Sequence, residues 1–287
     1  MQKYIDSFNQ MISLRGLTEY TLKSYTSYLN SFLNHLKSHL HKLPEDVSWD
    51  ELRSYILFIQ SDRNLSDRTI NAHIAQLRFF TLYVLHKPWD HYQLPTRKFD
   101  TYLPTIFSQQ EVHHFIDTIP NLKHKAVIAT MYSAGLRVGE VCHLKYSDIN
   151  RKNMTIHISH SKNRSERYAI LAANTLDILT QYWYAFGKPT DWLFPSTFNN
   201  GNSIVSFTVN RFVNDHLSRL GWSQKLNCHS FRHSFGTHLY ENNVDLLTIK
   251  SLLGHKSINS TTVYVHLGFH KNSKVKSPFD YCGGEDE

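Results

Sequence analysis

Two arginines in the second half of the chain lie in otherwise apolar segments and have the chemistry needed to hold a phosphate group. A guanidinium is planar and can bind two phosphate oxygens at once. Arg137 lies in the segment 134–140, and Glu140 shares its helical face and could orient it. Alone, such an Arg–Glu pair is more often a structural salt bridge. Arg232 follows His229 by one helical turn, which places an imidazole near the second guanidinium.

Breaking a phosphodiester also requires a nucleophile and an acid for the leaving oxygen. Tyr264 lies in the segment 261–266, after His255, which directly follows Gly254. The chain contains 16 tyrosines, so a single tyrosine in such a segment is normally a core or interface residue. These positions therefore suggest phosphodiester chemistry only if they meet in one site.

The histidines raise a second hypothesis, a metal site. His229 and His233 stand at i and i+4, a spacing that can hold zinc on one helical face, and His238 follows on the same predicted helix. However, the chain has 19 histidines, no HExxH motif and no carboxylate set beside these positions. Surface or structural histidines are the better interpretation, and we expect no metal.

Composition and charge favour a folded protein that binds a polyanion. Hydrophobic residues make up 41% of the 287 residues and charged residues 19%, which argues against disorder. The net charge of +7 is concentrated in residues 96–276, at +10, whereas the last eleven residues carry −4. A basic segment of this size suits nucleic acid, although ordinary surface charge explains it about equally well.

The sequence carries no signal for a membrane or for export. No apolar run is long enough to span a bilayer, and the N-terminus MQKYIDSFNQ lacks the apolar stretch of a signal peptide. The three cysteines, Cys142, Cys228 and Cys282, are widely spaced and form no CxxC pair, which fits a reducing compartment without disulfides. We therefore expect a cytoplasmic protein.

The first third of the chain predicts a helical domain over 1–90. Apolar residues recur on one helical face within 19–38. Ser48 and Glu51 form a capping box that opens a second helix, and Ser66 can cap a third.

Prolines and weak periodicity between 87 and 104 indicate an interdomain linker, assigned to 91–104. Its Arg97 and Lys98 could run along a phosphate backbone.

Residues 105–270 predict a second domain, followed by a tail at 271–287. A capping box at Ser108 and Glu111 opens this domain. Two strands are expected at 154–159 and 167–171, joined by the polar turn 162–166, and helices at 124–134, 173–186, 206–220, 230–242, 245–253 and 258–266. The predicted fold class is therefore mainly α with a small antiparallel β-sheet.

Taken in order, the polar segments resemble the motifs of the phage-integrase family, the tyrosine recombinases. Residues 135–140 (GLRVGE) are similar to the family's GLRxxE box, and 229–233 (HSFRH) to its HxLRH box. The segments 252–255 (LLGH) and 261–264 (TTVY) resemble the closing LGH…TxxxY pattern, and Lys162 falls in the turn where the family keeps a lysine. One box alone is weak, but four in this order and spacing are specific.

The resemblance implies a role for each residue. Tyr264 would attack the phosphodiester in line and form a 3′-phosphotyrosine. Arg137 and Arg232 would clamp the phosphate, His255 would hydrogen-bond one of its oxygens, and Glu140 would support the site. Neither a metal nor ATP is implied, because the phosphotyrosine conserves the energy of the broken bond.

His229 would be the base and Lys162 the acid that protonates the leaving oxygen. The turn that carries Lys162 lacks the family's usual glycines, which makes Arg164 a rival for this role. Phe231 replaces the usual leucine, and Ala169 replaces a proline in the second strand. Further candidates for DNA binding are basic residues near the linker and the turn: Arg97, Lys98, Arg164 and Arg167.

The resemblance also implies an architecture and partners. An N-terminal helical, SAM-like core-binding domain and a catalytic domain would form a C-shaped clamp on double-stranded DNA. A protein that is a monomer or dimer when free would assemble as a homotetramer on two sites and act through a Holliday junction. The segment 268–282 would dock into a neighbouring protomer or remain a frayed tail, with the aromatic anchors Phe269, Phe279 and Tyr281.

Two alternatives remain at this point. One is a DNA-binding clamp without catalysis, and the other is a type IB topoisomerase, which uses the same residue types without synapsis. The sequence does not distinguish integration, transposition, inversion and dimer resolution of a mobile element. It also leaves the target site, directionality and accessory proteins undetermined.

Overall fold

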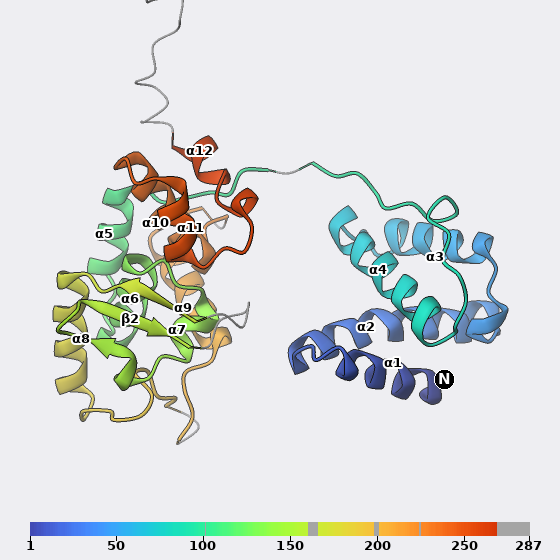
Figure 1. Cartoon of the computed structure of the whole chain (residues 1–287), viewed down its shortest axis with the longest axis horizontal. Helices are drawn as coiled ribbons and strands as arrows, with labels where there is room; N and C mark the ends of the chain where they lie inside the picture. Colours follow the sequence, from blue (N-terminus) through green and yellow to red (C-terminus); the bar gives the residue numbers. More distant parts are fainter. Residues whose placement is uncertain (101, 160–165, 198–200, 224, 269–287) are drawn as a thin grey trace, which may run out of the picture. The chain divides into compact units, whose positions relative to one another are not determined.

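The computed structural model describes residues 1–100, 102–159, 166–197, 201–223 and 225–268. The chain divides into two compact units, residues 1–101 and 102–287 (Figure 1). None of the helices in the described ranges combines the length and the apolar character that a membrane crossing requires.

The N-terminal unit is helical, and side-chain caps begin most of its helices. Ser48 accepts a hydrogen bond from the Glu51 backbone N–H at 3.3 Å, and the Glu51 carboxylate accepts one from the Ser48 N–H at 2.9 Å. The predicted capping box is therefore confirmed, as is the Ser66 cap, which accepts from the Thr69 N–H at 3.3 Å. The elements are α1 (Gln2–Leu14), α2 (Glu19–His35), the π-helical turn η1 (Leu36–Leu40), the 3-10 turn η2 (Pro44–Asp46), α3 (Trp49–Ser61) and α4 (Asp67–Tyr83).

Aromatic rings fill the core of this unit and include side chains from each of its α-helices. Phe8 packs edge-on against Phe80 with ring centroids 6.3 Å apart, and Phe32 packs against Tyr55 at 5.2 Å. The segment after α4 belongs to the same unit, because Leu94 is buried in this core.

The second unit, residues 102–287, carries the sequence motifs and is called the catalytic unit. It is mostly helical and contains one small sheet. Its elements are α5 (Gln109–Asp117), α6 (Leu122–Ser133), α7 (Val138–Cys142), the 3-10 turn η3 (Tyr146–Asp148), β1 (Ile149–Asn150), β2 (Thr155–Ile158), β3 (Arg167–Ile170), α8 (Ala173–Ala185), α9 (Ser206–Arg219), α10 (Cys228–Glu241), α11 (Leu246–Leu253), the 3-10 turn η4 (Ile258–Ser260) and α12 (Val263–Leu267).

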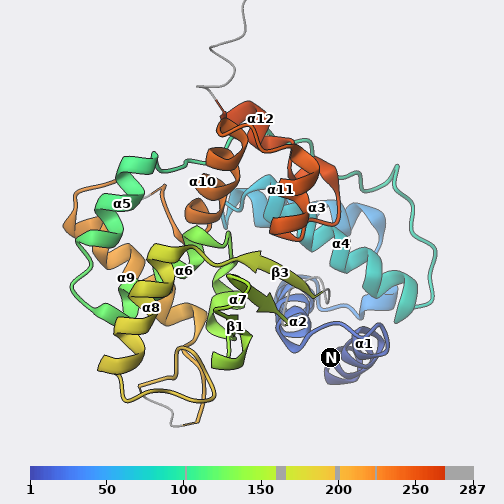
Figure 2. The same cartoon turned by 60° about the vertical axis from the view of Figure 1, so that its left-hand side comes forward.

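The predicted hairpin is present, and a further strand accompanies it. Strands β2 and β3 pair antiparallel, with Ile158 opposite Arg167, and β1 pairs with the other edge of β2. The sequence does not predict β1, because a strand of two residues shows no alternation. Strand β3 packs against α11 (Figure 2), so the hairpin adjoins the segments that carry the last two motifs.

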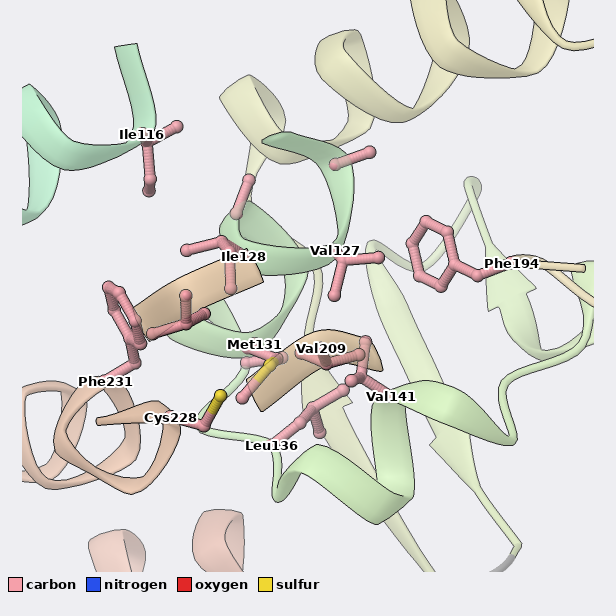
Figure 3. Packing of buried hydrophobic residues seen from close by; sticks show 14 of the residues in the cluster. Ile116, Val127, Ile128, Met131, Leu136, Val141, Phe194, Val209, Cys228 and Phe231 are labelled. Carbon is pink, nitrogen blue, oxygen red and sulfur yellow. The ribbon is translucent and has the colours of Figure 1, made fainter. Parts of the chain in front are cut away.

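Helix α6 forms the centre of this unit, and every residue from Ala126 to Met131 is buried. Its residues Val127, Ile128 and Met131 are fully buried. Figure 3 shows them surrounded by side chains from other parts of the unit, among them Leu136, Val141, Phe194, Val209 and Phe231. Phe231 also stacks on Phe107 with centroids 4.5 Å apart, so the residue that replaces the family's leucine fits the core.

One predicted helix, 258–266, is wrong as a continuous element. The structure has the turn η4 and the short helix α12, separated at Thr261 and Thr262. The reason is tertiary: the Thr261 side chain is completely buried and its hydroxyl hydrogen-bonds the Nδ1 of His255 at 2.9 Å. This contact breaks the helix immediately before Tyr264.

Candidate active site

Arg232 is a charged side chain in the interior of the unit, on the first turn and a half of α10. The residue is 1% exposed, and its two terminal nitrogens donate to the carbonyls of Gly135 at 2.7 Å and Leu253 at 2.6 Å. Burial lowers the pKa of Arg232 to about 10, and the nearby positive charge of Arg137 adds to this. The guanidinium therefore remains ionised at neutral pH.

Glu140 is the anion at the centre of three guanidinium groups. Its carboxylate accepts hydrogen bonds from Arg137 at 2.7 Å and from both terminal nitrogens of Arg167 at 3.0 and 2.8 Å. It also lies 3.8 Å from a nitrogen of Arg232. Burial raises the pKa of Glu140, but the hydrogen bonds and charges of Arg167 and Arg137 outweigh this and lower it overall. The carboxylate is therefore ionised and holds the arginines in place.

Arg137 is the most accessible of the three arginines. It precedes α7 in extended backbone conformation, two residues after Gly135, whose φ of 61° turns the chain sharply from α6. The Arg137 N–H donates to the Glu140 carboxylate at 2.9 Å, so the backbone and side chain of Arg137 have the same anchor. With 21% of its side chain exposed, Arg137 is available to a ligand.

Tyr264 is enclosed in the same region. It is 0% exposed, and its hydroxyl has no hydrogen-bond partner in the part of the chain that the structure describes. Its ring lies against Gly236 of α10, where an added Cβ would come within 2.5 Å of the Tyr264 Cζ. Burial raises the pKa of Tyr264 to about 12, while the charges of Arg232 and Arg137 act in the opposite direction. This hydroxyl is thus close to both guanidinium groups.

Three histidines accompany the tyrosine. The His255 ring is nearly parallel to that of Tyr264, with centroids 6.3 Å apart, and the His233 ring lies 6.0 Å from it. His229 is exposed and packs edge-on against His233 at 4.4 Å. Burial, together with the charges of Arg232 and Arg137, lowers the pKa of His255 to about 3. His255 is therefore neutral at physiological pH.

The structure thus brings together most of the site residues predicted from the sequence: Arg137, Glu140, His229, Arg232, His255 and Tyr264. Lys162 and its rival Arg164 lie outside the described residues, as do Phe269, Phe279 and Tyr281 of the tail. The described residues contain no group of three or more His, Cys, Asp and Glu arranged to hold a metal ion, and His238 instead bonds the Tyr132 hydroxyl at 2.9 Å.

Two predicted DNA-binding residues have intramolecular partners. Arg97 lies 2.5 Å from the Asp67 carboxylate and also donates to the Gln60 side chain. Arg167 differs more from the prediction, because its side chain is 9% exposed and bound to Glu140. Lys98 is exposed.

Sequence reasoning missed the importance of Arg167 and of His233. Burial lowers the pKa of His233 to about 4, and its Nδ1 has no partner among the described residues. From the sequence, His233 has no predicted role beyond that of a possible metal ligand and a member of the HSFRH segment. For Arg167, the one sequence signal is its position at the start of a strand directly after the polar turn, and no pattern reveals that its partner is Glu140.

Comparison with known proteins identifies the family of both units. The phage integrase family model matches residues 106–271, and the model of the phage integrase N-terminal SAM-like domain matches residues 4–91. The protein y4qK of Sinorhizobium fredii, named an integrase/recombinase, is 34% identical and aligns over 91% of this chain and 84% of its own length. Tyrosine recombinase XerD of Oceanobacillus iheyensis is 30% identical, over 91% of this chain and 92% of the relative.

A solved structure shares the fold. The XerH site-specific recombinase, bound to a palindromic difH substrate in a post-cleavage complex, has a TM-score of 0.73 at 20% identity. The match covers 93% of this chain and 82% of that one.

A SAM-like helical domain joined to a mainly α domain with an arginine-rich site defines a DNA strand transferase. The chain belongs to the phage integrase family, the tyrosine recombinases. It is a site-specific DNA recombinase, an enzyme that transfers DNA strands.

Proposed function

We propose that Tyr264 is the nucleophile and that Arg137 and Arg232 bind the scissile phosphate. The observation that carries this assignment is the enclosure of an unpartnered tyrosine hydroxyl beside two guanidinium groups. The Tyr264 oxygen would attack the phosphorus and form a phosphotyrosine, while the 5′-oxygen of the next nucleotide leaves with a proton. In the second step that 5′-hydroxyl, or one from a partner strand, attacks the phosphotyrosine and restores a phosphodiester.

Electrostatics supplies the main assistance to this step. As the phosphorus becomes five-coordinate, negative charge grows on its non-bridging oxygens, and preorganised cations stabilise that charge strongly in a site that excludes water. Arg137 and Arg232 are preorganised because Glu140 and the carbonyls of Gly135 and Leu253 already fix them. Little reorganisation is then needed when the phosphate binds.

The proton on Tyr264 must be removed during attack. With a pKa of about 12, about one molecule in 10⁵ is ionised at pH 7. His229 is the proposed base, because it is exposed at the site and can reach a bound substrate. His255 is neutral, and if its Nδ1 accepts from the Thr261 hydroxyl, its Nε2–H can donate to a phosphate oxygen. Lys162 is the proposed acid for the leaving oxygen, on the basis of the family resemblance.

The substrate is proposed to be double-stranded DNA carrying two recombination sites. XerH, which shares the fold, is bound to its difH substrate. The domain of residues 1–90 would bind the core site, 91–104 would link it to the catalytic domain 105–270, and four protomers would assemble on two sites. The reaction needs no ATP, because the phosphotyrosine conserves the energy of the broken bond.

Covalent trapping tests the assignment. Purified protein is mixed with DNA from the region around its gene, carrying nicks that let the leaving strand diffuse away, in the presence of a metal chelator. After denaturation in detergent, wild type is expected to remain attached to the DNA, and the Tyr264→Phe variant is expected to form no adduct.

Tyr182→Phe is the matched control. Tyr182 in α8 is also fully buried, and its hydroxyl has no partner among the described residues. However, its ring packs against the rings of Phe186 and Phe194. This variant is expected to form as much adduct as wild type. Salt-sensitive DNA binding by wild type without any adduct would contradict the proposal and favour a catalytically inactive clamp.

A further inference from the structure

Arg167 makes contacts that a DNA-binding or surface arginine would not make. It is the first residue of β3, and its two terminal nitrogens bind the two oxygens of Glu140 at 3.0 and 2.8 Å. Its Nε donates to the carbonyl of Leu252 at 2.9 Å. The side chain is 9% exposed, and all three nitrogens of its guanidinium donate hydrogen bonds within the protein.

The end of α11 is shaped around this side chain. Gly254 ends the helix with a φ of 64°, and an added Cβ there would lie 2.9 Å from the Arg167 Cδ and 3.2 Å from its Nε. The close approach places Arg167 beside the backbone that leads directly into His255. The neighbouring carbonyl of Leu253 binds Arg232 at 2.6 Å. Two arginines therefore hold consecutive carbonyls at the same helix end.

Through Glu140, Arg167 is also connected to Arg137, one of the two arginines proposed to bind the phosphate. The oxygen that accepts from Arg137 at 2.7 Å also accepts from Arg167 at 3.0 Å. A planar guanidinium fork fixes the plane of the carboxylate that it binds. Arg137 also bonds both Glu140 oxygens, through its backbone N–H at 2.9 Å and its side chain at 2.7 Å. Arg167 and Arg137 therefore set the orientation of Glu140 together.

We propose that Arg167 is a positioning residue for DNA cleavage, which sets Glu140 and the end of α11 so that Arg137, Arg232 and His255 face one phosphate. The inference rests on the proposed function. Arg167 does not touch the substrate, and its effect passes through these neighbours. A lysine in its place would keep the charge but would lose the bidentate fork and the bond to Leu252.

The test compares Arg167→Lys with wild type in single-turnover cleavage of nicked DNA at saturating protein. The rate constant of adduct formation is expected to fall about 10- to 100-fold, the size of loss that small displacements of catalytic groups produce. The final amount of adduct and the affinity for DNA are expected to stay within about twofold of wild type. Arg151→Lys is the matched control, because Arg151 is exposed and donates to the Thr180 hydroxyl at 2.8 Å, far in sequence from the site residues.

Three results would overturn the proposal. A reduced final amount of adduct with an unchanged rate constant would mean that Arg167 only maintains the fold. Weaker DNA binding with a smaller salt dependence would mean a direct phosphate contact. The third result uses DNA with a 5′-bridging sulfur, a leaving group that needs no proton. Full recovery of the Arg167→Lys rate constant on this DNA would mean that Arg167 positions the proton donor and not the phosphate-binding arginines.

A double-mutant cycle completes the test. Because Arg167 acts through Glu140, the rate loss from Arg167→Lys is expected to shrink at least several-fold in a Glu140→Gln background. If the two substitutions instead lower the rate constant by factors that simply multiply in the double variant, Arg167 and Glu140 act independently. That result would contradict the proposal that Arg167 acts through Glu140. Absence of any adduct from wild type would instead remove the proposed function itself, so the two failures are distinguishable.

Discussion

Among the described residues, both units bury histidines whose pKa is lowered by burial, but the second unit also buries ionised side chains. In the N-terminal unit, His35 and His73 lie among aromatic rings, and burial lowers the pKa of each, which keeps them neutral. In the catalytic unit, Glu140 and Arg232 are equally inaccessible but ionised, and each is held by opposite charge or by backbone carbonyls. Burying ions costs free energy unless they are paired and hydrogen-bonded. A buried cluster of charges is therefore a feature that points to a functional site more than to stability alone.

Two buried tyrosines show the same contrast. The Tyr55 hydroxyl in the N-terminal unit bonds Ser31 at 3.1 Å and lies 3.3 Å from the His73 ring nitrogen. The Tyr264 hydroxyl has no described partner but lies near two guanidinium groups. Tyr182 also lacks a described partner and is packed among aromatic rings. An unpartnered hydroxyl alone therefore does not identify a nucleophile, and the adjacent positive charge is the distinguishing feature.

The largest expected effect comes from removing the anion of the charged cluster. Glu140→Gln leaves three arginines without their shared counter-charge, and breaking a buried pair in this way costs about 3–5 kcal/mol of the free energy of unfolding. Urea unfolding of the full chain measures it. Glu111→Gln is the control, because Glu111 is exposed and glutamine can keep the capping box. A loss below about 1 kcal/mol for Glu140→Gln would contradict the central role of this carboxylate.

Lowering the pH tests whether burial keeps the histidines of the N-terminal unit neutral. His73 has a folded pKa of about 4, below the ordinary value of about 6.5 in the unfolded chain. The unfolded state therefore binds more protons between these values, and stability falls as the pH drops from 6.5 toward 4, by at most about 3 kcal/mol from this group. NMR titration of the His73 ring checks the cause. A midpoint near 6.5 would show that burial does not hold the ring neutral.

Gly236→Ala tests the close packing around Tyr264. The new methyl group would lie within 2.5 Å of the tyrosine ring, and such overpacking costs about 1–3 kcal/mol. Gly139→Ala is the control, since a Cβ at Gly139 in α7 meets nothing within 4 Å, and it is expected to stabilise by about 0.5–1 kcal/mol. Thermal unfolding compares the two. Equal effects would mean that Tyr264 does not pack against α10 as the structure shows.

The smallest expected effects should be the same in both units. Ser48 in the N-terminal unit and Ser108 in the catalytic unit form the same capping box, with the serine oxygen 3.3 and 3.2 Å from the capped N–H. Ser48→Ala and Ser108→Ala are each expected to cost about 1 kcal/mol in urea unfolding. A large difference between them would show that the units differ in their local helix signals and not only in their buried charges.

Local sequence patterns predict the elements whose causes are local. The capping boxes, the apolar helical faces of the first unit and the 2-residue alternation of the hairpin all arise from neighbours in sequence, and each is found in the structure. The set of site residues follows from the order of four motifs and not from any one of them.

The remaining features depend on contacts between distant segments. The break before Tyr264 depends on the bond between Thr261 and His255, and the position of Arg167 depends on Glu140, which is 27 residues away. Strand β1 forms through its antiparallel pairing with the edge of β2. Such partners leave no periodic signal in a single sequence.

Identification of the DNA-linked residue tests the central claim most directly. Protein trapped on nicked DNA is digested with trypsin and nuclease, and the peptide that retains a nucleotide is sequenced by mass spectrometry. Cleavage after Lys256 and Lys271 yields a peptide in which Tyr264 is the single tyrosine. The account predicts a nucleotide linked through its 3′-phosphate to Tyr264. A nucleotide on any other residue, or a link through a 5′-phosphate, would contradict it.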